Sequence, residues 1–219
     1  MINKLEVDSV ILDFGTRRVL QNVYLKSETE KITGLLGRNG TGKSCLMNII
    51  YGELTPNDKS IRLNGKSYLN NDRNPEDIRF LPQFNICPES NKVNRIFNDF
   101  DIDFNDFIVL FPDFKNFYNV KLNRLSKGER RIIEIYTILV SKTKFCMLDE
   151  PFSQIMPVHI NTIKQLLLRE KLHKGIVITD HLYRHITDIS DDLYVIDKGE
   201  TYLTKSGEDL VKYNYINSI

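Results

Sequence analysis

The sequence of 219 residues predicts an α/β fold built on a mostly parallel sheet. Three observations predict it. Residues 31–36 are a short apolar run, followed by a glycine-rich turn and then by apolar residues at helical spacing. From about residue 127 onward, helical and strand-like segments alternate, as they do around parallel sheets. Between these parts, phenylalanines recur every three or four residues, which indicates inserted helices.

The N-terminal part is predicted to form an antiparallel β subdomain. Its strand-like segments mix β-branched and apolar residues. One of them turns at Asn64-Gly65, a dipeptide that favours the left-handed backbone positions of a tight hairpin turn. The predicted strands of this part are residues 4–12 and 19–26 and a hairpin over residues 60–69, and residues 78–81 are predicted as another short strand that is not assigned to this subdomain.

The middle of the chain is predicted to form a small helical lobe at about residues 86–130, inserted into a single domain that spans residues 1–219. The stripe of phenylalanines predicts the core face of one or two short helices that break near Pro112. We expect about three of four of these rings to lie inside the lobe, since aromatic stripes at helical spacing are mostly core. The stripe consists of Phe97, Phe100, Phe104, Phe107, Phe111 and Phe114.

The last part of the chain returns to alternating helices and strands. The predicted elements are a helix over residues 129–140, a strand over 144–148, a helix over 158–171, a strand over 175–179, one more helix, a strand over 192–196 and a hairpin partner over 200–203.

Composition limits the class of protein. Hydrophobic residues make up 41% and charged residues 27%, as in ordinary globular domains. The 30 Lys and Arg against 29 Asp and Glu leave a net charge of +1, so no excess of cations points to nucleic acid. A membrane span needs about 20 apolar residues, whereas the run over residues 132–140 is short and contains Glu134. Three cysteines without metal-type spacing fit free thiols, so we expect a soluble intracellular protein.

The glycine-rich turn carries a phosphate-binding motif, G-x-x-x-x-G-K-S/T. Its glycines let backbone N–H groups surround phosphate oxygens, and the helix that begins near Lys43 adds its positive dipole end. Lys43 can reach the β- and γ-phosphates, and Ser44 can offer its hydroxyl to Mg²⁺. The motif consists of Gly37, Arg38, Asn39, Gly40, Thr41, Gly42, Lys43 and Ser44.

Two acids follow a later apolar strand. Asp149 stands at the predicted end of this strand and can hold the water shell of a magnesium ion. Glu150, one residue on, can orient and deprotonate an attacking water. Acids often close a buried strand simply because its end meets solvent, but their combination with the phosphate motif favours a catalytic interpretation.

Further motifs resemble a known family, the ATP-binding cassette (ABC) ATPases. Leu125-Ser126-Lys127-Gly128-Glu129 is similar to the family signature Leu-Ser-Gly-Gly-Gln and lies before the acidic strand, in the family's order. Gln83 in Leu81-Pro82-Gln83 resembles the glutamine loop, His181 in Thr179-Asp180-His181 resembles the switch region, and Phe14 stands where the family has an aromatic that stacks on adenine. The resemblance extends from Phe14 through Gly199.

The resemblance implies a fold, cofactors and site residues. The fold is a P-loop NTPase core with a mostly parallel sheet, an N-terminal antiparallel β subdomain and an inserted helical subdomain. The cofactors are ATP and Mg²⁺, with the metal held by Ser44, Gln83 and, through water, Asp149. Glu150, His181 and Lys43 take the catalytic roles. Phe14, Gln83 and Cys45 join the eight residues of the phosphate motif in binding ATP.

The resemblance also implies partners. A second copy, or a homologous ATPase subunit, is expected to pair head to tail, so that Ser126, Lys127, Gly128 and Glu129 complete the partner's ATP site. The motion of the dimer is expected to pass to membrane-spanning permease subunits. A short helix of the permease is expected to bind in the groove between lobe and core. The protein would then lie on the cytoplasmic face of the cell membrane.

Two departures from the family pattern bear on hydrolysis. Lys127 replaces a glycine and Glu129 replaces the glutamine of the signature, and we expect the Glu129 carboxylate to face away from phosphate. Met156 replaces an aspartate that helps the family's two sites act together. These changes put the rate and cooperativity of hydrolysis in question and leave nucleotide binding intact.

Two alternatives to a transporter ATPase stay open at this point. One is a soluble ABC-type ATPase that acts on DNA or ribosomes, although the 81 positions from Ser44 to Leu125 leave little room for a coiled-coil arm. The other is a regulatory subunit with weakened hydrolysis, which Met156 favours. A metal pair at His181 and His185 is disfavoured, because no third ligand follows at a plausible spacing.

Overall fold

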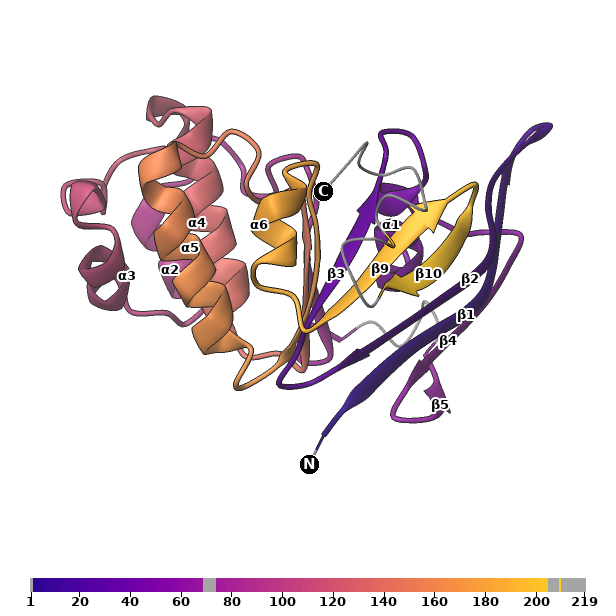
Figure 1. Ribbon diagram of the computed structural model, residues 1–219. Coiled ribbons are helices and arrows are strands. Elements are labelled where there is room, and N and C mark those ends of the chain that lie inside the picture. The colour runs from indigo at the N-terminus through magenta and orange to yellow at the C-terminus, as the bar shows by residue number, and fades with distance from the viewer. Residues whose placement is uncertain (1, 69–73, 205–208, 210–219) are drawn as a thin grey trace.

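The computed structural model describes residues 2–68, 74–204 and 209. Figure 1 shows helices α2 to α5 gathered at one end of the molecule, the antiparallel sheet at the other, and α6 and α1 between them. In chain order the elements are β1 (Lys4–Phe14), β2 (Arg17–Glu28), β3 (Ile32–Gly37), α1 (Lys43–Tyr51), β4 (Asp58–Leu63), β5 (Lys66–Ser67), β6 (Ile78–Leu81), α2 (Val93–Asp99), α3 (Phe104–Leu110), the 3₁₀ turns η2 (Pro112–Phe114) and η3 (Leu122–Arg124), α4 (Lys127–Val140), β7 (Phe145–Asp149), α5 (Pro157–Glu170), β8 (Gly175–Thr179), α6 (Tyr183–Thr187), β9 (Asp192–Asp197) and β10 (Glu200–Thr204).

The antiparallel sheet has the strand order β2-β1-β4-β5. Alternate side chains of β1 are buried, Leu5 and Val7 before a register shift near Ser9 (φ 55°) and Val10 and Leu12 after it, because alternate side chains of a strand point to the same face. Asn64 and Gly65 turn between β4 and β5 with φ of 54° and 76°, as the sequence predicts. The N-terminal antiparallel subdomain is therefore confirmed; the end of the predicted hairpin at Leu69 lies outside the described residues.

The larger sheet has the order β10-β9-β3-β8-β7-β6, and all its neighbours are parallel except β10 against β9. Every residue of the central strand β3 is buried, as expected where both faces of a parallel sheet are covered. Leu46 of α1 joins the apolar core on one face, and residues of α4, α5 and α6 join the core on the other. The α/β fold with a mostly parallel sheet is confirmed.

The phenylalanine stripe forms the interior of the helical end. Five of its six rings pack against one another, two of them (Phe97 and Phe107) also against Tyr136 of α4, and these five are at most 8% exposed, whereas Phe100 is only partly buried. The second helix, α3, ends just before Pro112, as predicted. The first ends earlier, at a left-handed Asp101 (φ 55°) that the periodic pattern does not reveal.

The helical end shares its core with the sheet. Residues of α4 and α5 pack with Phe107 and Phe111 on one side and with strands β7 and β8 on the other. The boundaries of a helical subdomain at about residues 86–130 therefore stay a prediction. Within the described ranges, no helix is both long and apolar enough to cross a membrane.

Candidate functional site

The phosphate motif forms the loop between the central strand β3 and helix α1. Gly42 precedes α1 with φ of 104°, and a Cβ there would meet the Leu20 side chain at 2.7 Å, so only glycine fits this backbone. No side chain caps the start of α1. Its first-turn N–H groups and the positive end of its dipole therefore face the loop, an arrangement that favours a bound anion.

Lys43 lies inside the loop that it follows. Its Nζ donates hydrogen bonds to the backbone oxygens of Gly37 at 2.6 Å and Arg38 at 3.2 Å. Burial lowers the pKa of Lys43 from its usual value, and the nearby charges of Glu150, Asp149 and Asp180 oppose that shift. The ammonium is thus held beside the uncapped start of α1, where a phosphate would meet both.

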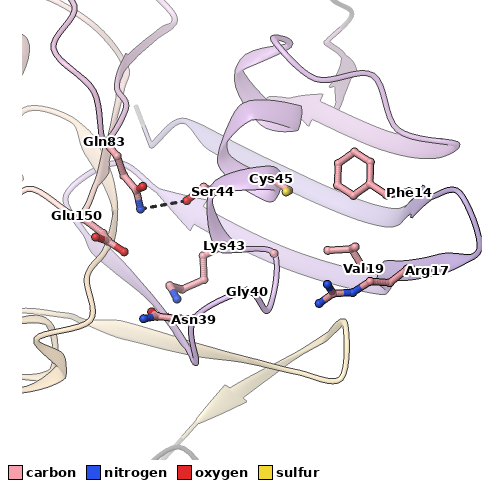
Figure 2. Close-up of a pocket in the computed structure, with 11 residues that line it drawn as sticks. Phe14, Arg17, Val19, Asn39, Gly40, Lys43, Ser44, Cys45, Gln83 and Glu150 are labelled. Carbon is pink, nitrogen blue, oxygen red and sulfur yellow. Dashed lines mark hydrogen bonds between the residues drawn. The ribbon is translucent and has the colours of Figure 1, made fainter.

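Ser44, Gln83 and Asp149 bring oxygen-bearing side chains to the same place. The Gln83 side-chain amide lies 3.4 Å from Ser44 Oγ (Figure 2). Asp149 is 1% exposed, and its buried Oδ1 has no hydrogen-bond partner. Burial raises the pKa of Asp149 to about 6, against the opposing hydrogen bond with Ser44. A hydroxyl, an amide and a carboxylate with an unpartnered oxygen fit Mg²⁺, a cation that prefers oxygen ligands.

Glu150 stands next to His181 and Ser153. Its Oε2 lies 3.6 Å from His181 Nδ1 and accepts a hydrogen bond from Ser153 Oγ at 3.2 Å. The Glu150 backbone has φ of 48°, a left-handed conformation that is uncommon for this residue type and occurs preferentially at functional sites. Asp180, fully buried, holds this turn in place by accepting hydrogen bonds from Phe152 N and Leu182 N at 2.9 Å each.

A cavity of about 530 Å³ lies over the loop, and Phe14, which is 53% exposed, stands at one end of it (Figure 2). The opposite end is formed by Gln83 and Glu150. Of the predicted ATP-binding residues, the cavity wall does not include Gly37, Arg38 and Thr41. It is lined by Phe14, Arg17, Val19, Asn39, Gly40, Gly42, Lys43, Ser44, Cys45, Gln83 and Glu150.

The signature residues lie elsewhere, at the start of α4. The Ser126 side chain accepts a hydrogen bond from Glu129 N at 3.3 Å, and the Glu129 carboxylate accepts one from Ser126 N at 2.7 Å. A Cβ on Gly128 would meet the backbone oxygen of Gln154 at 2.6 Å. Ser126 and Lys127 are exposed, and none of the four signature residues lines the cavity.

Three further residues belong to the site and were not predicted from the sequence. Arg17 and Val19 line the cavity next to Phe14. In the sequence they lie at the start of a strand-like segment, and no motif marks them as functional. Ser153 donates a hydrogen bond to Glu150 and follows the two acids by three residues. His185, by contrast, packs its ring against Phe152 with centroids 5.3 Å apart.

The fold and the loop together define the class of protein. A parallel sheet whose central strand leads through a glycine-rich loop into an uncapped helix, with two acids at the end of the next strand but one, is typical of the P-loop nucleotide-binding proteins.

Comparisons with known proteins define the family. The family model described as "ABC transporter" matches residues 20–153, which is more than half of the chain. A probable ABC transporter ATP-binding protein of Azorhizobium caulinodans is 30% identical over 90% of this chain and 75% of its own length. The chain therefore belongs to the ABC transporter family, and the predicted resemblance is confirmed.

Other relatives agree with this assignment. The lipopolysaccharide export system ATP-binding protein LptB of Haemophilus influenzae is 25% identical over 98% of this chain and 95% of its own. Among solved structures, one titled "Structure of ATP binding subunit of ABC transporter" has a TM-score of 0.80 at 18% identity and covers 96% of this chain and 93% of its own. This structural similarity confirms the fold. Within the family, the chain resembles the ATP-binding subunits.

Proposed function

We propose that the chain is the ATP-hydrolysing subunit of an ABC transporter and that it powers transport through separate membrane subunits. The observation that carries the proposal is the meeting of Lys43, Ser44, Gln83 and Glu150 around one cavity beside the buried Asp149. A cation for the phosphates, oxygen ligands for a metal and a general base are the parts that phosphoryl transfer to water requires.

Each residue has a role that follows from its position. Backbone N–H groups at the start of α1 and the Lys43 ammonium bind the phosphates, and Phe14 stacks on the base at the far end of the cavity. Ser44, Gln83 and Asp149 would hold Mg²⁺, which would supply positive charge against the phosphates. Glu150 orients a water and accepts its proton, while His181 and Ser153 fix the direction of the Glu150 carboxylate.

A second subunit is part of the proposal. Ser126 and Lys127 are exposed and lie apart from the cavity of their own chain. We infer a head-to-tail dimer, of two copies or with a homologous subunit, in which they complete the partner's site. Met156, which is 57% exposed, lies on the loop before α5, and it replaces an aspartate with a side chain that cannot pair with a charge.

A groove on the other side of β6 is proposed to receive the membrane subunit. It is a cavity of about 470 Å³ lined mainly by apolar side chains, among them Phe80, Ile86, Phe100 and Ile138. Phe84 stands at its rim and is 69% exposed, an unfavourable exposure for a phenylalanine unless a partner covers it. Binding there would hold the protein on the cytoplasmic face of the membrane.

Glu150→Gln tests the proposal. The substitution keeps the shape of the side chain and removes the base, so ATP turnover should fall by at least about 100-fold. ATP affinity should stay within about threefold of the wild-type value, and ATP-bound dimers should accumulate in size-exclusion chromatography with light scattering. Glu76→Gln, in which the same chemical change is made at an exposed residue outside the cavity and outside the signature, is the control. Unchanged turnover in Glu150→Gln would remove Glu150 from its role, and a wild-type protein that binds no ATP would overturn the proposed function.

A further inference from the structure

Arg131 and Glu134 are charged residues of α4 that are buried without being part of the cavity of the phosphate loop. Arg131 is 3% exposed and Glu134 is fully buried. They lie one helical turn apart, with Arg131 Nη1 4.0 Å from Glu134 Oε2. Buried charges are costly to desolvate, and such a pair is weak evidence for a purely stabilising role. Their hydrogen bonds therefore indicate what they do.

Arg131 joins the ends of two strands. Its Nη1 donates to the backbone oxygen of Pro82 at 2.7 Å, and its Nη2 donates to the backbone oxygen of Asp149 at 2.8 Å. The pairing of β6 with β7 ends one residue earlier on each strand, at Leu81 and Leu148. The planar guanidinium thus fixes the distance between two backbone segments at a point where they no longer form hydrogen bonds to each other.

Glu134 holds the same segment farther along. Its Oε1 accepts hydrogen bonds from Ile86 N and Cys87 N, both at 3.0 Å. Residues 82–87, here called the glutamine segment, are therefore attached to α4 at both ends, with the exposed Gln83 between the two attachments.

We propose that Arg131 is a positioning residue for the magnesium site, because it sets where Gln83 stands relative to Asp149 and Glu150. This inference rests on the proposed function. Arg131 touches neither nucleotide nor metal; it acts through the Pro82 and Asp149 backbones, each adjacent to a residue that faces the cavity. Two of the proposed magnesium ligands, Gln83 and Asp149, lie at the ends of the neighbouring strands β6 and β7, and their separation depends on a side chain of a third element, α4.

The position of Arg131 on α4 extends the proposal to the second subunit. Arg131 lies less than two turns after Ser126, the residue that caps this helix. In the proposed dimer, the start of α4 meets the partner's nucleotide. The next turn of the same helix, through Arg131, positions the metal ligands of its own chain.

Arg131→Lys is the test, and Arg130→Lys is its matched control. Lysine keeps the charge but loses the planar fork that reaches two oxygens at once. Arg130 is the preceding residue of α4, and its side chain is 8% exposed, but it bonds to Glu89 Oε1 at 2.7 Å and contacts neither Pro82 nor Asp149. Both variants lose one buried arginine, and only one should disturb the metal site.

The readout is the affinity for a fluorescent ATP analogue with Mg²⁺ and with EDTA. The gain in affinity that Mg²⁺ gives should fall by about tenfold in Arg131→Lys, as expected for a residue that orients metal ligands. Affinity in EDTA should stay within about twofold of the wild-type value, and Arg130→Lys should keep the full gain. The midpoint temperature of thermal unfolding should be lowered to a similar extent in both variants.

Other outcomes overturn the inference. They are an unchanged magnesium gain in Arg131→Lys, an equal loss of that gain in Arg130→Lys, or a loss of affinity in EDTA that parallels the loss of thermal stability. If Arg131→Lys does not fold, Glu134→Ala releases the glutamine segment from its other end and should also lower the gain about tenfold; an unchanged gain there overturns the inference. A wild-type protein that binds nucleotide without any magnesium gain also overturns it, whereas no binding at all overturns the proposed function.

Discussion

The starts of helices α1 and α4 differ in whether a side chain caps their backbone N–H groups. Both helices leave backbone N–H groups unpaired in their first turn, and both are expected to meet phosphate. Glycine precedes α1, and no side chain caps it. Ser126 precedes α4 and forms a reciprocal pair of hydrogen bonds with Glu129.

The difference shows that the start of α1, and not the start of α4, can bind an anion within a single chain. At α1 the helix dipole and Lys43 act on the cavity without competition from an acceptor side chain of the helix itself. At α4 the serine hydroxyl and one backbone N–H are already engaged by Glu129, and the Lys127 side chain is exposed there. The first turn of α4 is stabilised by hydrogen bonds within its own chain. This suits a surface that is proposed to meet nucleotide only in the dimer.

The largest effect is expected from removing the cation at each helix start. Lys43→Ala should weaken ATP binding by about 100-fold, because it deletes charge-assisted hydrogen bonds to phosphate. Lys127→Ala should leave ATP binding by the single chain unchanged and lower dimer turnover by about threefold. Titration calorimetry and a steady-state ATPase assay measure the two. Equal losses of ATP affinity in both variants would contradict the distinction between the two ends.

A smaller effect is expected from Asp149, the buried acid that faces the uncapped end. Because burial raises its pKa from 3.8 to about 6, the folded protein retains a proton that the unfolded chain releases. Stability is therefore lost as the pH rises from about 4 to 6. Relative to Asp149→Asn, the free energy of unfolding of the wild type should fall by about 2 kcal/mol between about pH 4.5 and 7.5. Urea unfolding in EDTA measures this difference. A difference that does not change with pH would show that Asp149 is already charged in the folded state.

The smallest effect concerns the capped end. Glu129→Ala removes one half of the pair with Ser126 and should lower the free energy of unfolding by about 1 kcal/mol, the usual contribution of a cap. Glu129→Gln keeps an acceptor oxygen and should lose less. Thermal unfolding of the two variants gives the comparison, and ATP affinity of the single chain should not change in either. Weaker ATP binding in Glu129→Ala would mean that the start of α4 acts on its own chain's site.

The sequence predicts those features that depend on local spacing. The phosphate motif, the acids after β7 and nearly all strands are recognisable because glycine, lysine and apolar residues recur at fixed intervals. The left-handed Asp101 that ends α2 and the cavity residue Arg17 are not, because neither follows a repeated pattern.

Arg131 and Glu134 illustrate the limit best. In the sequence, Glu134 merely interrupts an apolar run, yet in the structure it is fully buried and bonds to amides 48 and 47 positions away. Such pairing depends on how β6, β7 and α4 meet, and no spacing along α4 encodes it. The phosphate loop, Gln83 and Glu150 were predictable because each follows the end of one strand, whereas the network beneath them joins three elements.

The central position of β3 has a consequence for how the chain is made. β3 pairs with β8 through Ile32 and Ile176, and with β9 through Thr33 and Asp192. During synthesis the phosphate loop leaves the ribosome long before either neighbour exists, and Gln21 N must also wait for the Gly199 oxygen to which it donates. A chain that ends before residue 175 therefore lacks both strands that flank β3 and, with them, the neighbours between which the phosphate loop begins.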